Sequence, residues 1–356
     1  CIGAGVNNAI AHDVDFAELF ASSDFKAALD AELKVEGVGE PSSNVAEVVY
    51  SHKRAATWRT QAKFVVRRFM DMYWRTPSYN LTRIVLALLL ALLFGLIFVG
   101  ADYDSYQGLS SGIGMVFTAT LFNAMVAYQS VLPLTCAERA SYYRERASQT
   151  YSALWYWVGS TVAEIPYIFT SNLVFTIVFF PMVGFTNFGA GVVYWLAQSV
   201  LVMTQVFMGQ LFCYALPTEE VAAIIGVLFN IIFILFMGFM PPAYAIPAGY
   251  KWLYDLSPHR YALATMGALL FADCDELPTW NETLNAYENV GEQLGCQPMR
   301  NTPITIGHVT MKEYTEQFFG MKHDDIPRNF AVVIAYAVLF RVLALLALRY
   351  INHQKK

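Results

Sequence analysis

Two sets of residues in this sequence are suited to binding. Charged residues and tyrosines alternate over 138–151, a composition that suits a short helix docking on another protein domain, although a solvated basic loop has the same composition. Phe, Met and Asn recur in two apolar segments, around 117–123 and 230–240, where they offer adaptable apolar and stacking contacts to varied hydrophobic ligands. The sequence holds no Gly-x4-Gly-Lys-Ser/Thr loop for ATP phosphates and no Cys-x2-Cys pair. It therefore predicts no ATPase activity in this chain and no metal site.

The chain that positions these residues is unusually apolar. Of its 356 residues 56% are hydrophobic and 14% are charged, whereas soluble domains average about 25% charged residues. A net charge of −5 argues against a nucleic-acid binder. About 20 apolar residues cross a bilayer as a helix, and long uncharged stretches meet that length. We therefore expect an all-α polytopic membrane protein with six transmembrane helices, over about 84–101, 112–132, 152–180, 192–216, 221–240 and 330–348.

Lys and Arg residues predict the orientation of these helices. They gather before the first span, in the loop between the second and third spans, and in the C-terminal tail. Alternate threading places these segments on one side, so both termini are expected in the cytoplasm and 241–328 outside. Two charges fall within spans. Glu164 is costly there and should pair with an Arg or lie near the cytoplasmic end, and Arg341 should extend toward the cytoplasm.

The expected external region contains two candidate sites of covalent modification, a disulfide and a glycosylation site. Cys274 and Cys296 are the cysteines that lie there, where oxidation is permitted, and they are expected to form a disulfide; unpaired thiols or a bond to another chain are the alternatives. Asn281-Glu-Thr283 is a glycosylation sequon, and its occupancy stays open.

The N-terminal part differs from the rest. Residues 1–54 are polar and acidic and begin at Cys1 without a signal peptide, so they are expected to be a linker in a longer polypeptide. An amphipathic helix should follow over about 55–76, ended by Pro77. Such a helix lies in the membrane interface, either as an anchor or as a lever between a soluble domain and the first span.

Several motifs together resemble one family, the pleiotropic-drug-resistance ABC transporters of the G subfamily, and specifically their second, C-terminal membrane domain. The match extends over nearly the whole chain, and Cys1-Ile-Gly-Ala-Gly-Val6 is similar to the segment that closes the preceding ATPase domain. The other motifs are Tyr73-Trp-Arg-Thr-Pro-Ser-Tyr-Asn80, the 138–151 loop, Glu164-Ile-Pro166, Gly238-Phe-Met-Pro-Pro242 and Trp252-Leu-Tyr-Asp-Leu-Ser-Pro258.

The resemblance implies a type-2 ABC exporter permease. Its parts would be a linker (1–54) after a nucleotide-binding domain, a connecting helix (55–79), five spans with re-entrant helices (80–271), an external loop (272–328), and the sixth span with a tail (329–356). The implied substrate cavity consists of Phe117, Phe122, Asn123, Asn230, Phe233 and Met237. The implied exit plug is Phe239 and Met240, and the implied coupling positions are Glu138, Arg139, Arg144 and Glu145.

The same resemblance implies ATP-driven export of hydrophobic or amphipathic compounds across the plasma membrane by alternating access. ATP and Mg²⁺ would bind in partner nucleotide-binding domains, and the first membrane half of the same polypeptide would complete the pathway. An ion-coupled carrier or channel is the alternative, but it would need several embedded charges, and only Glu164 and Arg341 qualify. A membrane-embedded acyltransferase would need His or Asp at an interfacial helix end.

Overall fold

The structure is a computed structural model that describes residues 16–35, 39, 54, 56–283 and 286–353, and it separates into two units, 1–53 and 54–356. The first unit contains α1 (Phe16–Ala21) and α2 (Asp24–Leu33). Ser23 caps α2 by accepting a hydrogen bond from the Lys26 amide at 3.2 Å. The 1–6 motif and most of the predicted linker lie outside the described residues.

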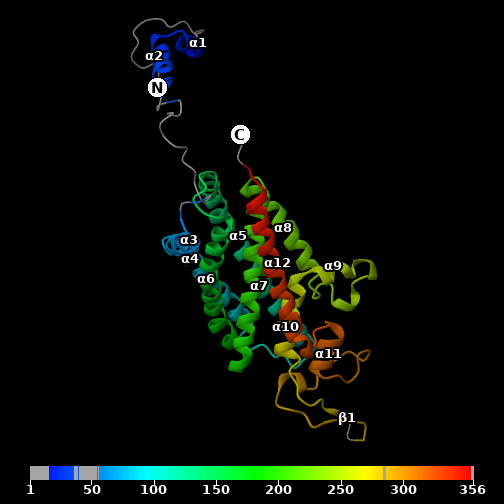
Figure 1. The fold of residues 1–356 in the computed structure, drawn as a ribbon. Coiled ribbons are helices and arrows are strands. Elements are labelled where there is room, and N and C mark those ends of the chain that lie inside the picture. Colours follow the sequence, from blue (N-terminus) through cyan, green and yellow to red (C-terminus); the bar gives the residue numbers. More distant parts are fainter. Residues whose placement is uncertain (1–15, 36–38, 40–53, 55, 284–285, 354–356) are drawn as a thin grey trace, which may run out of the picture. The chain divides into compact units, whose positions relative to one another are not determined.

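Long helices dominate the second unit (Figure 1). By length and composition, five helices of the described chain could cross a membrane. They are α4 (Pro77–Ile97), α5 (Tyr106–Ala147), α6 (Ala153–Met182), α7 (Phe188–Ala215) and α12 (Ile326–Tyr350). Helix α7 is the most buried of the five because α5, α6 and α12 all pack against it.

The predicted fifth span is shorter than expected. Helix α8 (Glu219–Leu235) has 17 residues, or about 26 Å at 1.5 Å per residue, which is the lower limit for a spanning helix. It ends at Leu235 rather than near Met240 because Gly238 adopts a positive φ of 92° and two prolines follow. The count is thus five clear spans and one short apolar helix.

The predicted amphipathic helix forms as α3 (Trp58–Trp74), with Thr57 as its N-cap. Its buried stripe of Gln61, Val65, Phe69 and Tyr73 packs against α6, where the Phe69 and Tyr156 rings lie 4.9 Å apart. The apolar face is therefore used in packing within the protein. Ala55, the expected first residue, lies outside the described residues.

The region after α8 is a compact cap of short elements. Its helical elements are η1 (Ala243–Ala245), η2 (Ala248–Tyr250), α9 (Lys251–Leu256), α10 (Pro258–Phe271), η3 (Leu294–Cys296), α11 (Met311–Phe318) and η4 (His323–Asp325). An antiparallel pair, β1 (Thr279–Asn281) and β2 (Ala286–Glu288), departs from the all-α expectation. A disulfide joins Cys274 to Cys296 with 5.0 Å between their Cα atoms, which ties the segment after α10 to η3.

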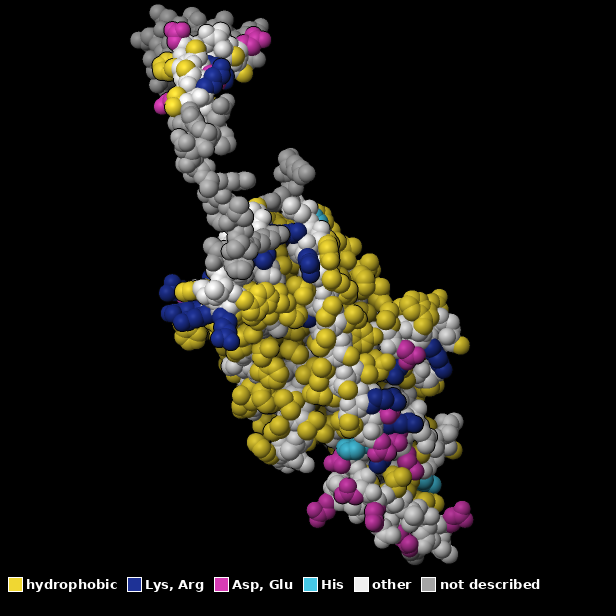
Figure 2. Space-filling view, in the orientation of Figure 1, with side chains coloured by type: hydrophobic (Ala, Val, Ile, Leu, Met, Phe, Trp, Pro, Cys, Tyr) yellow, Lys and Arg dark blue, Asp and Glu magenta, His cyan; other side chains and the backbone are white. Residues whose placement is uncertain are grey.

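On the face shown in Figure 2 a broad apolar surface covers the helices of the second unit, with Lys and Arg beside α3 and Asp and Glu over the cap. The exposed side chains of α4 illustrate it, since apart from Pro77, Ser78 and Thr82 in its first turns they are aliphatic. They include Leu81, Val85, Leu89, Leu92, Leu93 and Leu96. A surface of this kind is stable only against hydrocarbon.

Helices α5 and α8 meet through a polar contact at a glycine. The Tyr128 hydroxyl on α5 donates to the Ala222 carbonyl on α8 at 2.7 Å. A Cβ on Gly226 would lie 1.7 Å from that hydroxyl oxygen, so only glycine leaves room for the contact.

We expect Gly226→Ala to destabilise the packing of α5 on α8 by about 1–3 kcal/mol through overpacking. The measurement is the thermal unfolding midpoint of the purified full-length protein in detergent. Gly249→Ala is the matched control, because nothing lies within 4 Å of its Cβ position. An unfolding midpoint for Gly226→Ala equal to that of the control would contradict this packing.

Candidate substrate pathway and coupling surface

One face of α5 is uncovered but not lipid-like. Gln107, Ser111, Phe122 and Gln129 are exposed there, and the partly exposed Thr118 lies between them. Their spacings of four and seven residues put them on one helix face, which we call the polar stripe. Because α4 exposes only aliphatic side chains in the positions given above, the stripe suits water, a substrate or another protein surface better than lipid.

The cavity positions expected on α5 point in different directions. Phe117 is half-buried, and its ring lies 4.9 Å from the Phe239 ring. Phe122 is 44% exposed on the polar stripe. Asn123 is buried and lines a small void with residues of α4, α6 and α7, including Arg83 and Asn172, and its Nδ2 donates to the Ala119 carbonyl at 3.0 Å.

The cavity positions expected on α8 and just after its end are buried. Asn230, Phe233 and Met237 are 2%, 6% and 1% exposed. The Asn230 Nδ2 donates to the Gly226 carbonyl at 2.9 Å, and its buried Oδ1 has no hydrogen-bond partner among the described residues. Phe233 packs on His259 of α10, with ring centroids 5.6 Å apart. These three side chains thus face the interior of this chain.

The two expected plug residues differ in environment. Phe239 lies between Phe117 and the Phe319 ring, whose centroid is 6.0 Å away in a stacked arrangement. Met240 is 69% exposed. The structure therefore brings Phe117 and Phe239 together at the end of the bundle that carries the cap.

At the other end, two of the expected coupling residues pair with α3. The Arg68 guanidinium lies 2.6 Å from a Glu145 oxygen and 3.5 Å from a Glu138 oxygen, while the Tyr151 hydroxyl donates to Glu145. Burial lowers the pKa of Arg68, but the hydrogen bond with Glu145 and the charges of Tyr151, Glu145 and Glu138 together outweigh burial and raise that pKa. Burial, followed by the bond to Glu145, raises the pKa of Tyr151, so the phenol stays a donor.

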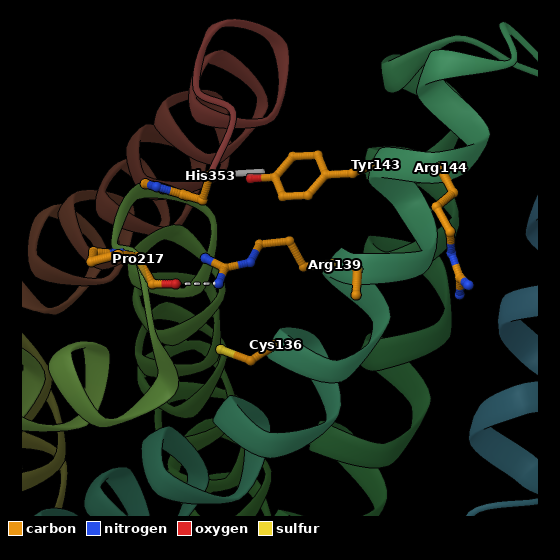
Figure 3. A pocket seen from close by; sticks show the side chains of 7 residues that line it. Cys136, Arg139, Tyr143, Arg144, Pro217 and His353 are labelled. Carbon is orange, nitrogen blue, oxygen red and sulfur yellow. Dashed lines mark hydrogen bonds between the residues drawn. The ribbon is translucent and has the colours of Figure 1, made fainter. Parts of the chain in front are cut away.

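Arg139 has a different role. It donates to the carbonyls of Cys213, Leu216 and Pro217, the last two at 2.5 and 2.6 Å, and so caps the C-terminal end of α7. Figure 3 shows this guanidinium at an open pocket of about 480 Å³, across from His353. Arg144, which also lines the pocket, is exposed and bonds to Ser141 at 3.3 Å. Of the four expected positions, Arg144 has the most accessible charge.

Both expectations for 138–151, a separate short helix and a solvated loop, are wrong. These residues continue α5 to Ala147, and a turn at 148–152 leads into α6. Few loop-forming residues interrupt the segment, and the Arg68 and Arg139 contacts hold it against α3 and α7, so the helix has no reason to end at the membrane surface. The sequence pattern assigns Arg68 no role beyond the basic charge before the first span, although it lies three residues after Val65 and next to Phe69 of the buried stripe.

The expectation that Glu164 pairs with an Arg is confirmed. It is fully buried on α6, where the Tyr79 hydroxyl donates to it and the Arg83 guanidinium lies 3.6 Å away. Arg83 also donates to the Tyr79 hydroxyl at 2.8 Å. This triad joins α4 to α6, and no spacing rule would identify Arg83 as the partner from the sequence alone.

The expectation that Arg341 extends to the cytoplasm is wrong. Arg341 is 3% exposed on α12. It donates to Thr161 at 2.6 Å, to the Trp157 carbonyl at 2.6 Å, to Ser160 at 2.5 Å and to Gln210. These acceptors from α6 and α7 solvate the guanidinium, so it need not leave the interior.

Arg83→Gln should lower the free energy of unfolding by about 3–5 kcal/mol, because it leaves the Glu164 carboxylate buried without its counter-charge. The double variant Arg83→Gln/Glu164→Gln should be more stable than Arg83→Gln alone. Thermal unfolding of the full-length protein tests both. Arg300→Gln, which removes an exposed pair with Asp102 and Asp104, should cost less than about 1 kcal/mol. Equal losses for Arg83→Gln and Arg300→Gln would refute the role of the triad.

Comparison with known proteins agrees with this architecture. A family model described as ABC-2 type transporter matches residues 60–271, and one described as CDR ABC transporter matches residues 284–356. The chain is 27% identical over 349 residues to "Pleiotropic drug resistance protein 1" of Nicotiana tabacum, covering 96% of this chain and 22% of that protein.

Two further relatives show the same pattern. "ABC transporter G family member 37" of Arabidopsis thaliana is 29% identical over 347 residues, and "ABC transporter G family member 44" of Oryza sativa subsp. japonica is 27% identical over 347 residues. Each alignment covers 96% of this chain and 22% of the relative, so the chain spans about a fifth of the length of these curated relatives. The chain belongs to the ABC-2 type transporter family and is a membrane domain related to the pleiotropic-drug-resistance ABC transporters.

Proposed function

We propose that this chain is the second membrane-spanning half of an ATP-driven exporter of hydrophobic or amphipathic compounds, such as drugs, xenobiotics, lipids or sterols. It would act in the plasma membrane with both termini cytoplasmic. The first membrane half of the same polypeptide would face it across the pathway. ATP and Mg²⁺ would bind in partner nucleotide-binding domains, and this chain would supply no catalytic residue.

The polar stripe on α5 is the observation that carries the proposal. It mixes amide, hydroxyl and aromatic side chains on a helix that could span the membrane, and it stays uncovered within residues 56–283 and 286–353. If the other membrane half faced this stripe, the two would enclose a passage that requires few specific hydrogen bonds from its substrate. Such a passage suits varied hydrophobic compounds. Phe122 lies on this face, and Phe117 with Phe239 lies near its cap end.

Helix α5 also offers a route for coupling. It runs without interruption from the polar stripe to Glu138 and Glu145, so a displacement at 138–147 would reach the stripe. Pro133 lies inside the helix and removes the hydrogen bond to the Gln129 carbonyl, which makes this turn the natural place for bending. Binding of ATP in partner domains would move the 138–147 end and alternate the access of the pathway.

The competing ion-coupled carrier has one observation in its favour, the carboxylate of Glu164 buried on α6. However, Arg83 and Tyr79 from α4 surround this carboxylate, and Arg341 is bound by neutral acceptors of α6 and α7. Both groups join helices within the chain, and neither lies on the polar stripe. The arrangement therefore favours a structural use of these charges.

Substitutions along the proposed pathway should change the substrate profile. Thr118→Leu on the stripe, and Asn230→Ala and Phe233→Ala on the buried face of α8, should each alter efflux of at least one of several test drugs by about fivefold, equivalent to about 1 kcal/mol. The measurement is ATP-dependent efflux from cells, normalised to the amount of transporter at the surface.

Leu235→Ala is the control, since this residue is 50% exposed on the outer face of α8 and should leave the profile unchanged. A change for Thr118→Leu alone would retain the stripe and remove the α8 residues from the cavity. An unchanged profile for all three variants would reject the pathway.

A further inference from the structure

A membrane-facing groove lies between α6 and α7, away from the polar stripe. It has a volume of about 420 Å³ and is lined mainly by apolar side chains of the two helices and of the connection at 183–187. The residues that matter below are Ile177, Phe180, Pro181, Phe188, Gly191 and Trp195. Ile177 and Phe188 are 62% and 85% exposed, so within this chain the groove opens toward the surrounding bilayer.

The two walls of the groove have the same length. On α6 the lining runs from Leu173 to Pro181, and on α7 the facing lining runs from Asn187 to Trp195. Each wall covers eight residue steps, or about 12 Å of helix. Aromatic rings of Phe180, Phe188 and Trp195 contribute flat, stiff surfaces to these walls.

Two residues of the groove wall, Ile177 and Pro181, define a backbone acceptor. Pro181 is part of α6 but has no N–H, so the Ile177 carbonyl lacks its partner one turn further along. The nearby Thr176 hydroxyl does not replace it, because it donates to the Asn172 carbonyl at 2.8 Å. Helix carbonyls point toward the C-terminal end, so this oxygen faces the Met182 end of α6, where the helix leaves the membrane. An unpaired carbonyl in hydrocarbon favours any ligand that brings a hydroxyl donor.

A glycine keeps the groove open. At Gly191 an added Cβ would lie 3.5 Å from the Phe180 ring, which is ordinary van der Waals distance, so alanine would fit but a longer side chain would extend into the space between the helices. The opening near Thr186 and Asn187 is polar and exposed. Together these features describe an apolar slot with a polar mouth and an acceptor near that mouth.

We propose that this groove binds a sterol from the surrounding bilayer, with the sterol hydroxyl donating to the Ile177 carbonyl and the ring system lying along Phe180 and Trp195. A rigid, flat ring system loses little conformational entropy in such a slot, whereas a flexible acyl chain loses much more. Phosphatidylcholine also carries no hydroxyl or N–H donor for this carbonyl. The site depends on α6 and α7 alone and does not rest on the proposed export function.

The first experiment uses the full-length transporter in lipid nanodiscs that contain a photoactivatable sterol, with cross-linked peptides identified by mass spectrometry. We expect labelling within 173–195 that Gly191→Leu reduces at least fivefold. Val193→Leu, which adds bulk on α7 outside the groove lining, should label like the unchanged protein. Equal labelling of the two variants, or equally strong labelling of the same peptides by a photoactivatable phosphatidylcholine, would overturn the proposal.

The second experiment tests the acceptor. Pro181→Ala restores an N–H that can occupy the Ile177 carbonyl, without filling the groove. In the unchanged protein a 3-hydroxysterol should compete with the photoprobe about threefold to tenfold better than its 3-keto analogue, as expected for one hydrogen bond. In Pro181→Ala this preference should disappear, even if both competitors bind less well. A preference that survives in Pro181→Ala, or one that is absent from the unchanged protein, would exclude the Ile177 carbonyl as the sterol contact.

Discussion

Hydrocarbon around the helices offers no partner for a charge, and the positions of the polar groups inside the bundle follow from that constraint. Glu164 is neutralised by Arg83 and Tyr79, which joins α6 to α4. Arg341 is surrounded by oxygen atoms of α6 and α7, which joins these helices to α12. Removing one partner would leave a buried charge, so these contacts restrict how the helices can pack. The apolar core could accept several alternative registers, whereas the buried charges accept few.

Hydropathy predicted the helices well. Five of the six expected spans appear as long apolar helices, and the amphipathic helix before the first span appears as α3. The boundaries were harder. The predicted fifth span runs to Met240, whereas α8 ends at Leu235, because Gly238 with its positive φ lies inside that hydrophobic run. The predicted second span ends near 132, whereas α5 continues to Ala147.

Side-chain partners were the least predictable part of the candidate site. Arg68 and Glu145 are 77 residues apart, and Arg139 finds its carbonyl acceptors on α7 through the tertiary fold. Helical periodicity gives the face on which a residue lies but not the helix that will cover it. For the same reason Phe233 could be assigned to α8, while its packing against His259 of α10 could not. The polar stripe on α5 could have been found from the spacing of Gln107, Ser111, Thr118 and Gln129.

Arg139 has a mechanical consequence beyond capping. It holds the last carbonyls of α7. Arg146, about two turns further along the same face of α5, donates to the carbonyls of Leu348 and Arg349 at the end of α12, at 2.9 and 2.7 Å. Charged hydrogen bonds thus clamp the backbone ends of two helices to a third. A displacement of the Ala147 end of α5 would therefore move the ends of α7 and α12 with it, without deforming the apolar core. The three helix ends would shift together as one rigid body.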